Sequence, residues 1–327
     1  MAKEVQNNAA EVVETGAMAL AGLTAADVAA VASVVDNARA ANTTAAYRSA
    51  WTAWQAWADE KGTSALPASP AAVAAYLVHR AAAGAKLSTV RMAKAAIAAA
   101  HRETGADNPC ASPLVAKTIK GLARAAADAG NGGQRQAAAL TSEALAAIRA
   151  TATAPRTGRG GRLETAAGAW RRGLVDIALC AVMADGGLRR SEAAGLVWGD
   201  VDKVDDGSGR VTIRRSKTDC EGAGAVVAIT ARAMADLDAI RNGAGDDALV
   251  FGLSAAQINR RLREAAKTAG LGAGFSGHSG RVGMARRMTA NGAPMAVTMN
   301  QGRWKSPRMV ARYTQGEAAG AALAYLC

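Results

Sequence analysis

The sequence predicts a mainly α-helical protein with two domains, the second of which contains one small antiparallel sheet. Capping residues and glycines recur at helix-length intervals between residues 23 and 130, which indicates an all-helical first domain. The polar, glycine-rich residues 131–140 have the composition of a linker. Beyond them only two β-branched stretches interrupt the helical pattern, so residues 141–327 are expected to form a second, mostly helical domain.

Five helices joined by short loops are expected in the first domain, after a flexible tail at residues 1–22. Each helix opens near a side chain that can accept a first-turn N–H, and most close at a glycine. Two openings place a proline directly after the cap, where its fixed φ suits the first turn. The expected helices run from Thr24, paired with Asp27, to Arg39, from Asn42 or Thr43 to Gly62, from Ser69-Pro70 to Gly84, from Ser88 to Gly105, and from Ser112-Pro113 to Gly130.

Tryptophans recur at three-residue spacing on the second expected helix, at Trp51, Trp54 and Trp57. Such a stripe can stack on nucleic acid bases. Helical spacing of large apolar residues is more typical of a core seam, however, so we favour the core.

The second domain is expected to open with a helix capped by Thr141. A basic loop at residues 157–162 follows, for which a phosphate-binding loop and a plain surface loop remain open alternatives. A buried helix over residues 167–184 comes next. The β-branched residues 211–215 and 225–229 flank a turn and predict a hairpin, after which the chain is helical again.

The net charge of +12 is concentrated near the end of the chain. Residues 257–327 carry eleven basic and two acidic side chains and contribute +9 of it. A domain with this charge usually binds a polyanion, and nucleic acid is the first candidate; the alternative is a solvated cationic surface. We favour nucleic acid, because these arginines alternate with the motif residues described below.

The composition argues against several other classes of protein. No stretch approaches the roughly 18 apolar residues of a membrane span, and the first residues lack a signal-peptide pattern. The four cysteines lack the spacing of a disulfide framework or zinc site, and only three histidines are present. We expect no metal, no cofactor and no membrane, and a cytoplasmic, nucleoid-associated protein encoded by a bacterium, phage or plasmid.

Two expected helices of the first domain present a basic face. Between residues 80 and 124 there are eight basic side chains and two acidic ones. Helical spacing places most of these basic residues on one side, where they can contact a phosphate backbone. The residues assigned to DNA contact are Lys86, Arg91, Lys94, Lys117, Lys120 and Arg124 in the first domain, and Arg260, Arg261 and Arg286 in the second.

Six residues of the second domain form an ordered set that fits one reaction: Arg189, Lys217, His278, Arg281, Trp304 and Tyr313. Arginine forks match the non-bridging oxygens of a phosphodiester, and a tyrosine can attack its phosphorus to form a covalent intermediate without a metal. The indole N–H of a tryptophan can donate one further hydrogen bond to such an oxygen. The set therefore predicts an enzyme that breaks and rejoins DNA.

Several positions leave alternatives open. Arg190 directly follows Arg189 and can compete for its role. Glu192, one turn on, can brace an arginine fork through a salt bridge or form an ordinary charge pair of the helix. Tyr325 is a second candidate for the nucleophile. We prefer Tyr313, because Tyr325 lies in an apolar stretch that suits docking onto a partner.

In order and spacing these residues resemble the catalytic domain of the tyrosine recombinase (phage integrase) family, and its Cre-like members in particular. The segment SGHSGR at residues 276–281 and the nine-residue interval from Trp304 to Tyr313 carry the likeness. The resemblance covers residues from about 177 to 325. The preceding helical region is similar to the family's core-binding domain in a less specific way.

The resemblance makes Tyr313 the nucleophile and Lys217 the general acid, which protonates the leaving 5′ oxygen. The other site residues stabilise the transition state or brace the site: Arg189, Glu192, His278, Arg281 and Trp304. It also implies a C-shaped clamp around double-stranded DNA with an inverted-repeat target site. A homotetramer on two sites would then exchange strands through a Holliday junction.

Two rival functions are kept beside site-specific recombination. A type IB topoisomerase uses nearly the same chemistry and would relax supercoils as a monomer without site preference. A catalytically silent DNA-binding regulator would retain the fold alone. The intact set of residues argues against silence, and the apolar C-terminal stretch argues for assembly.

Overall fold

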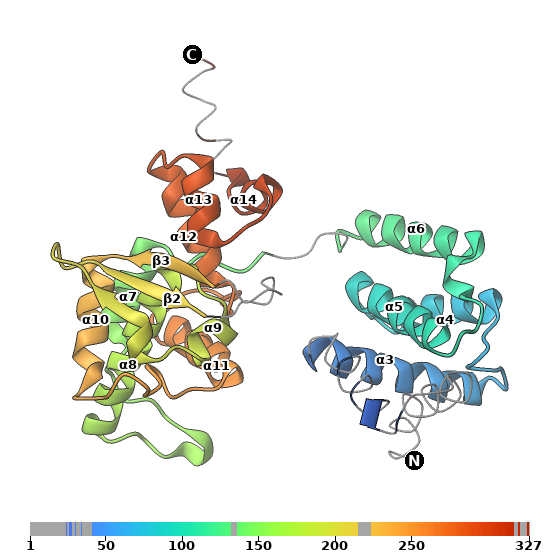
Figure 1. Ribbon diagram of the computed structural model, residues 1–327, viewed down its shortest axis with the longest axis horizontal. Coiled ribbons are helices and arrows are strands. Elements are labelled where there is room, and N and C mark those ends of the chain that lie inside the picture. Colours follow the sequence, from blue (N-terminus) through green and yellow to red (C-terminus); the bar gives the residue numbers. More distant parts are fainter. Residues whose placement is uncertain are drawn as a thin grey trace. The chain divides into compact units, whose positions relative to one another are not determined.

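The computed structural model describes residues 41–131, 136–214 and 224–316, with single residues between 24 and 34 and at 320 and 326. The chain forms two compact units, Met1–Gln134 and Arg135–Cys327 (Figure 1). Its described part is mostly helical and contains one three-stranded antiparallel sheet. The predicted class, mainly α with a small antiparallel sheet, is therefore confirmed. The expected tail and most of the expected helix from Thr24 to Arg39 lie outside the described residues.

Between residues 41 and 131 the first unit contains four helices and one 3-10 turn: α3 (Ala41–Glu60), α4 (Pro70–Ala82), α5 (Leu87–Glu103), η1 (Pro109–Ala111) and α6 (Pro113–Asp128). The predicted caps of α4 and α6 are present, because the hydroxyls of Ser69 and Ser112 accept first-turn N–H groups. The start of α5 differs from the prediction. It begins one residue before Ser88, with Lys86 at the cap in extended conformation and no side-chain cap.

Aromatic side chains of α3 and α4 form the centre of the first unit's core. Trp54 is fully buried, and its ring stacks on that of Trp57 with centroids 5.6 Å apart. Both rings contact Tyr76 of α4, and the indole N–H of Trp54 donates to the carbonyl of Ala65. The tryptophan stripe is therefore a core seam, as predicted.

In the second unit, helices precede and follow the three strands of one sheet along the chain. Its helices are α7 (Ser142–Thr151), α8 (Ala166–Asp185), α9 (Arg190–Ala194), α10 (Ala231–Arg241), α11 (Ala255–Thr268), α12 (Ser279–Ala290), α13 (Met295–Gly302) and α14 (Pro307–Tyr313), with 3-10 turns η2 (Arg159–Gly161) and η3 (Trp198–Asp200). Its strands are β1 (Val201–Lys203), β2 (Gly209–Ile213) and β3 (Ala225–Ile229), in the order β1-β2-β3.

The predicted hairpin is β2 and β3, with Val211 opposite Val227. Strand β1, which pairs Val201 with Val211, was not predicted. Three residues of which only the first is buried carry too little of the alternating pattern that marks a strand. The inward-facing residues of β2 and β3 join one apolar core with α8, which is buried along most of its second half.

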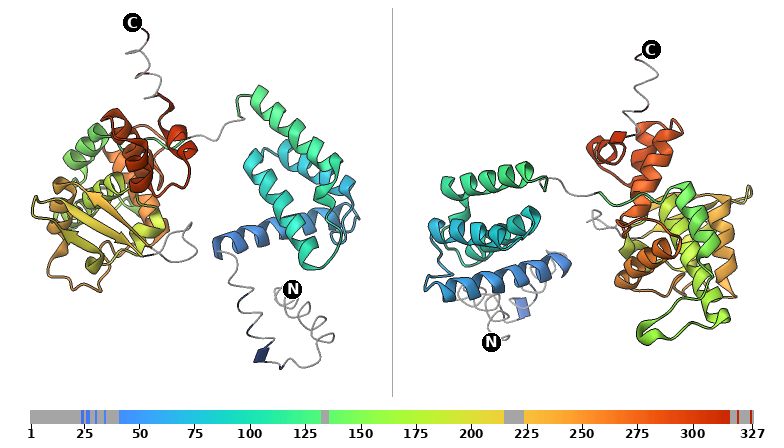
Figure 2. Two further views of the ribbon diagram at one scale, coloured as in Figure 1. Left: turned by 45° about the horizontal axis from the view of Figure 1, so that its top comes forward. Right: turned by 180° about the vertical axis from the view of Figure 1, so that it is seen from behind.

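Helices α12, α13 and α14 gather at one end of the second unit, beside β3 (Figures 1 and 2). Their common core is small and consists of Met284, Ala285, Trp304 and Val310. Gln301 ties this group to the sheet, because its side-chain amide exchanges hydrogen bonds with the N–H and carbonyl of Ala228. The end of α13 is thereby held at the edge of β3, next to the start of α9. None of the described helices has the length and apolar character needed to cross a membrane.

Candidate active site

Predicted site residues from three parts of the chain meet where α9, α12 and the segment from α13 to α14 come together. Arg189 lies at the cap of α9, and Glu192 lies in its first turn. His278 is the cap residue of α12, and Arg281 follows in the first turn. Trp304 lies between α13 and α14, and Tyr313 ends α14. More than 80 residues of sequence separate the α9 segment from the other two, so tertiary packing brings them together.

Glu192 is the acidic centre of the site. Its side chain is almost fully buried, and one carboxylate oxygen accepts from Nη1 of Arg189 at 2.6 Å. The other oxygen accepts from the backbone N–H of Arg189 and from Nη2 of Arg303, each at 2.8 Å. Burial alone would raise the pKa of the carboxyl, but the charge of Arg303 and the hydrogen bonds from Arg189 outweigh it and lower the pKa. Glu192 is therefore an ionised brace and not a surface charge pair.

Arg281 is the most deeply buried arginine of the site, with 3% of its surface exposed. Its Nη1 donates to the carbonyl of Gly187 at 2.7 Å, and its Nη2 donates to the carbonyl of Gly302 at 2.6 Å. Burial and then the neighbouring guanidiniums of Arg189 and Arg303 lower its pKa to about 10. Its charge is held in place by carbonyl dipoles and is not cancelled by a carboxylate of its own.

Two glycines of α12 explain why Arg281 can reach this position. A Cβ atom at Gly280 would lie 2.3 Å from the carbonyl oxygen of Met183, and one at Gly283 would lie 2.2 Å from that of Leu140. No side chain fits at either place, so the glycines let α12 lie directly on α8 and on the segment before α7. Close contact on one side turns Arg281, between them, toward the carbonyls of Gly187 and Gly302.

Trp304 and Tyr313 form the aromatic side of the site. Their ring centroids lie 5.5 Å apart with planes at 41°. Trp304 is 7% exposed and Tyr313 is half-buried beside it, both packed on the small core of α12 and α14. Within the described residues no hydrogen bond engages the Tyr313 hydroxyl or the Trp304 indole N–H. Both groups are thus available to an incoming ligand.

The structure separates Arg189 from its neighbour Arg190. The side chain of Arg190 is exposed and lies over Gly277, where a Cβ would meet it at 3.1 Å. Of these two neighbours, only Arg189 pairs with Glu192. Lys217 and Tyr325, the predicted acid and the alternative nucleophile, lie outside the described residues. Among the described residues no group of three or more His, Cys, Asp or Glu side chains could hold a metal ion.

Residues 163–319 match the model of the phage integrase family, which covers nearly all of the second unit's helices and its whole sheet. These residues form a phage integrase family domain.

Solved structures resemble this chain over both the phage integrase domain and the unit that precedes it. A Tn1549 transposon integrase in complex with transposon right end DNA aligns with a TM-score of 0.57 and 13% identity, over 98% of this chain and 99% of the other. A lambda integrase dimer bound to a COC′ core site aligns with a TM-score of 0.55 and 16% identity, over 94% of each chain. At these identities the alignments show the fold. No curated protein matches the sequence.

The predicted DNA-contacting residues of the first unit remain on its surface. Five of the six are exposed and Lys94 is partly so: Lys86, Arg91, Lys117, Lys120 and Arg124. None of the six forms an ion pair with an acidic residue in the described ranges. Two of the predicted residues in the phage integrase domain, Arg260 and Arg286, are exposed as well.

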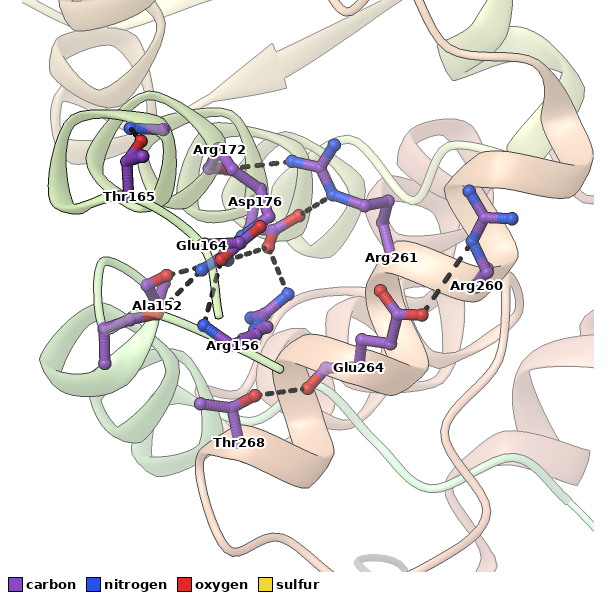
Figure 3. A network of polar contacts seen from close by, with 12 residues as sticks. Ala152, Arg156, Glu164, Thr165, Arg172, Asp176, Arg260, Arg261, Glu264 and Thr268 are labelled. Carbon is purple, nitrogen blue, oxygen red and sulfur yellow. Dashed lines mark hydrogen bonds and ion pairs between the residues drawn. The ribbon is translucent and has the colours of Figure 1, made fainter. Parts of the chain in front are cut away.

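Arg261 is reassigned, because its side chain faces the protein interior (Figure 3). Its Nε donates to Asp176 at 2.5 Å, and its Nη2 donates to the carbonyl of Arg172. Asp176 is fully buried and also accepts from Arg156 and Arg172. Arg261 therefore neutralises a buried carboxylate and is no longer assigned to DNA. Its spacing of three residues from Ile258 and four from Ala265, both buried, was the sequence signal for this inward position.

One arginine of the site was missed by sequence reasoning. Arg303 stands directly before Trp304, and its guanidinium joins Glu192 and the carbonyls of Gly186 and Gly187. Its backbone is left-handed, with φ 53° and ψ 47°. The direction of this side chain depends on that turn, and an arginine gives no sequence signal for a left-handed conformation.

Proposed function

We propose that this protein is a tyrosine site-specific recombinase, which cleaves and rejoins duplex DNA through a 3′-phosphotyrosyl intermediate. One observation carries the proposal: Arg189 and Arg303 share the carboxylate of Glu192, while buried Arg281, which has no carboxylate partner, lies over the ring of Trp304 beside Tyr313. A buried cluster with excess positive charge favours an anionic ligand. A phosphodiester gains negative charge as a nucleophile attacks, so it gains most from such a cluster in the transition state.

In the proposed reaction Tyr313 gives up its phenolic proton to solvent water and attacks the scissile phosphorus. The bond from phosphorus to the tyrosine oxygen forms as the bond to the 5′ oxygen breaks, and Lys217 supplies the proton that the 5′ oxygen needs. Arg189, Arg281, His278 and Trp304 stabilise the charge on the non-bridging oxygens. Because the phosphotyrosyl link keeps the energy of the broken bond, a 5′ hydroxyl can attack it and rejoin the strand.

We further propose that both units grip one duplex half-site and that four copies assemble on two sites. The lambda integrase tetramer bound to a Holliday junction, which aligns with a TM-score of 0.54 and 16% identity over 95% of this chain and 77% of the other, supports this assembly. On this chain an apolar hollow lined by Ala293, Met295 and Val310 lies between α13 and α14. This hollow can bind an apolar helix from a neighbouring copy. Assembly favours recombination over the monomeric topoisomerase alternative.

Covalent capture tests the proposed function. Fragments of the DNA that flanks the gene are incubated with the full chain, the mixture is denatured, and DNA still attached to protein is sequenced. We expect recovery of an inverted repeat, and a nicked duplex of that sequence should accumulate the adduct. Tyr313→Phe should bind this duplex and form no adduct, whereas Tyr325→Phe should form it normally. An adduct with Tyr313→Phe would overturn the assignment of the nucleophile.

The rival functions give different results in the same experiment. A topoisomerase would relax supercoiled plasmid without the repeat, and its captured fragments would share no sequence. A silent regulator would protect the repeat from nuclease digestion and give no covalent product with the wild-type chain. A recombinase should also convert a plasmid with two repeats into exchanged products.

A further inference from the structure

Arg303 occupies a backbone conformation that is unfavourable for its residue type. Its φ of 53° lies in the left-handed region, and Asn242, at φ 41°, is the other non-glycine residue there in the described ranges. A residue with a Cβ pays roughly 1–2 kcal/mol for this conformation. Asparagine is among the residues that tolerate it best, and arginine is not. The side chain of Arg303 must therefore make contacts that outweigh the strain.

Those contacts all lie inside the candidate site. Nη2 of Arg303 donates to Glu192 at 2.8 Å and to the carbonyl of Gly187 at 2.9 Å, and Nη1 donates to the carbonyls of Gly186 at 3.0 Å and Gln301 at 3.3 Å. The carbonyl of Gly187 also accepts from Arg281 at 2.7 Å. Arg303 thus binds the carboxylate of Glu192, which also binds Arg189, and the carbonyl of Gly187, which also binds Arg281. It touches neither of these two arginines through a hydrogen bond of its own.

Arg303 also changes the charge of the buried cluster. Arg189 and Arg281 against Glu192 would leave one positive charge, and the guanidinium of Arg303 adds a second. Its side chain is only 7% exposed, so water screens this charge weakly. A lysine could supply the charge but not the planar fork that reaches four acceptors together. The geometry of the contacts, more than the charge alone, requires arginine.

We propose that Arg303 is a positioning residue for strand cleavage, which fixes Glu192 and the carbonyl of Gly187 so that Arg189 and Arg281 meet the phosphate in the correct orientation. This proposal rests on the proposed function, because it assumes that the cluster binds the scissile phosphate. It predicts that Arg303 acts mainly on the rate of the cleavage step, because its fork is engaged by Glu192 and backbone carbonyls of the site. The affinity for DNA should change little, because most of it comes from many phosphate contacts along the duplex.

Arg303→Gly is the decisive variant, because glycine adopts the left-handed conformation without strain and removes only the side chain. The nicked duplex carrying the captured repeat serves as substrate for the full chain. We expect adduct formation at saturating protein to slow by about 10- to 100-fold, while the dissociation constant changes by less than about threefold. Asn242→Gly, which removes the other left-handed side chain at the end of α10, should cleave at the wild-type rate.

A double-mutant cycle tests whether Arg303 acts through Glu192. In a Glu192→Gln background the further loss from Arg303→Gly should shrink to less than about threefold, because the contact that it supports is already altered. Arg303→Lys, which keeps the charge and loses the fork, should remain at least about fivefold slower than wild type and serves as the test variant if Arg303→Gly fails to fold. Equal losses in both backgrounds, a wild-type rate in Arg303→Gly, or full rescue by lysine would each overturn the proposal. A wild-type chain that forms no adduct would instead contradict the proposed function.

Discussion

The guanidinium of Arg281 lies over the indole ring of Trp304, with Cζ 4.8 Å from the ring centroid. A cation above a tryptophan face gains about 0.5–2 kcal/mol, and most when water is excluded, as it is here. The contact joins the start of α12 to the segment between α13 and α14. One residue therefore helps to orient a buried arginine with its ring, while its indole N–H stays available for a ligand.

Substitutions at Trp304 should separate these two roles. Trp304→Phe keeps an aromatic face under Arg281 but lacks the N–H, so we expect cleavage to slow by about tenfold, the value of one hydrogen bond. Its stability should fall by no more than about 2 kcal/mol. Trp304→Ala leaves a cavity and should destabilise the second unit by about 3–5 kcal/mol. Urea unfolding and adduct formation on the nicked duplex measure both effects; equal cleavage by Trp304→Phe and wild type would remove the N–H from the mechanism.

Glu192 should make the stability of the second unit depend on acid pH. Its pKa in the folded protein lies below the ordinary value of 4.5, so its contribution is fully present above about pH 4.5 and is lost as the pH falls through the lowered pKa. Glu192→Gln should be less stable than wild type by about 3–5 kcal/mol at pH 7. Urea unfolding between pH 3 and 7 should show that the difference in unfolding free energy between wild type and Glu192→Gln decreases below pH 4.5. A constant difference would mean that the arginines do not stabilise the ionised form of the carboxylate.

Lys217 should matter only when the leaving oxygen needs a proton. Lys217→Ala is expected to cleave normal DNA slowly, and a 5′-bridging phosphorothiolate should restore cleavage, because a thiolate leaves without protonation. Arg189→Ala provides the control, since loss of charge stabilisation should not be rescued by sulfur at this position. Rescue of Arg189→Ala but not of Lys217→Ala would show that another group is the acid.

Arg260 and Arg261 are adjacent in sequence and should have opposite effects. Arg261→Ala removes a charged hydrogen bond from buried Asp176 and should cost about 2 kcal/mol of stability, with no change in the salt dependence of DNA binding. Arg260 is exposed, and its Nε lies 3.8 Å from Oε1 of exposed Glu264, which makes a weak surface ion pair. Arg260→Ala should therefore change the free energy of unfolding by no more than about 0.5 kcal/mol. Its DNA affinity should become less salt-dependent. Unfolding curves and salt titrations of both variants decide the matter, and the reverse pattern would return Arg261 to the DNA surface.

The basic face of the first unit should appear in the salt dependence of binding. Log affinity is expected to fall by about 0.9 per phosphate contacted for each unit of log salt. Alanine at Arg91, Lys94, Lys117 or Lys120 should each lower this slope by about one and leave sequence preference intact. Lys61→Ala is the control, because Lys61 pairs with Glu60 at the end of α3, away from this face. Unchanged slopes in all four variants would mean that the face points to solvent.

Local signals accounted for much of the fold. The serine–proline caps at Ser69 and Ser112 opened helices where predicted, because a capping hydroxyl and a proline act within one turn of the chain. The hairpin of β2 and β3 followed from β-branched runs in the same way. Strand β1 was missed, since its three residues are held by pairing with Val211 and its neighbours and not by their own pattern.

By itself the sequence determined the helical punctuation, the tryptophan core, the family likeness, and the order of Arg189, Glu192, Arg281, Trp304 and Tyr313 along the chain. Only the tertiary structure decided which arginines serve which carboxylate. Arg261 turned inward to Asp176, Arg190 turned outward, and Arg303 entered the site through a left-handed turn. The physical reason is that an arginine side chain is long and flexible, so its partner is set by which buried carboxylate lies within reach after packing, and residues far apart in sequence make that choice.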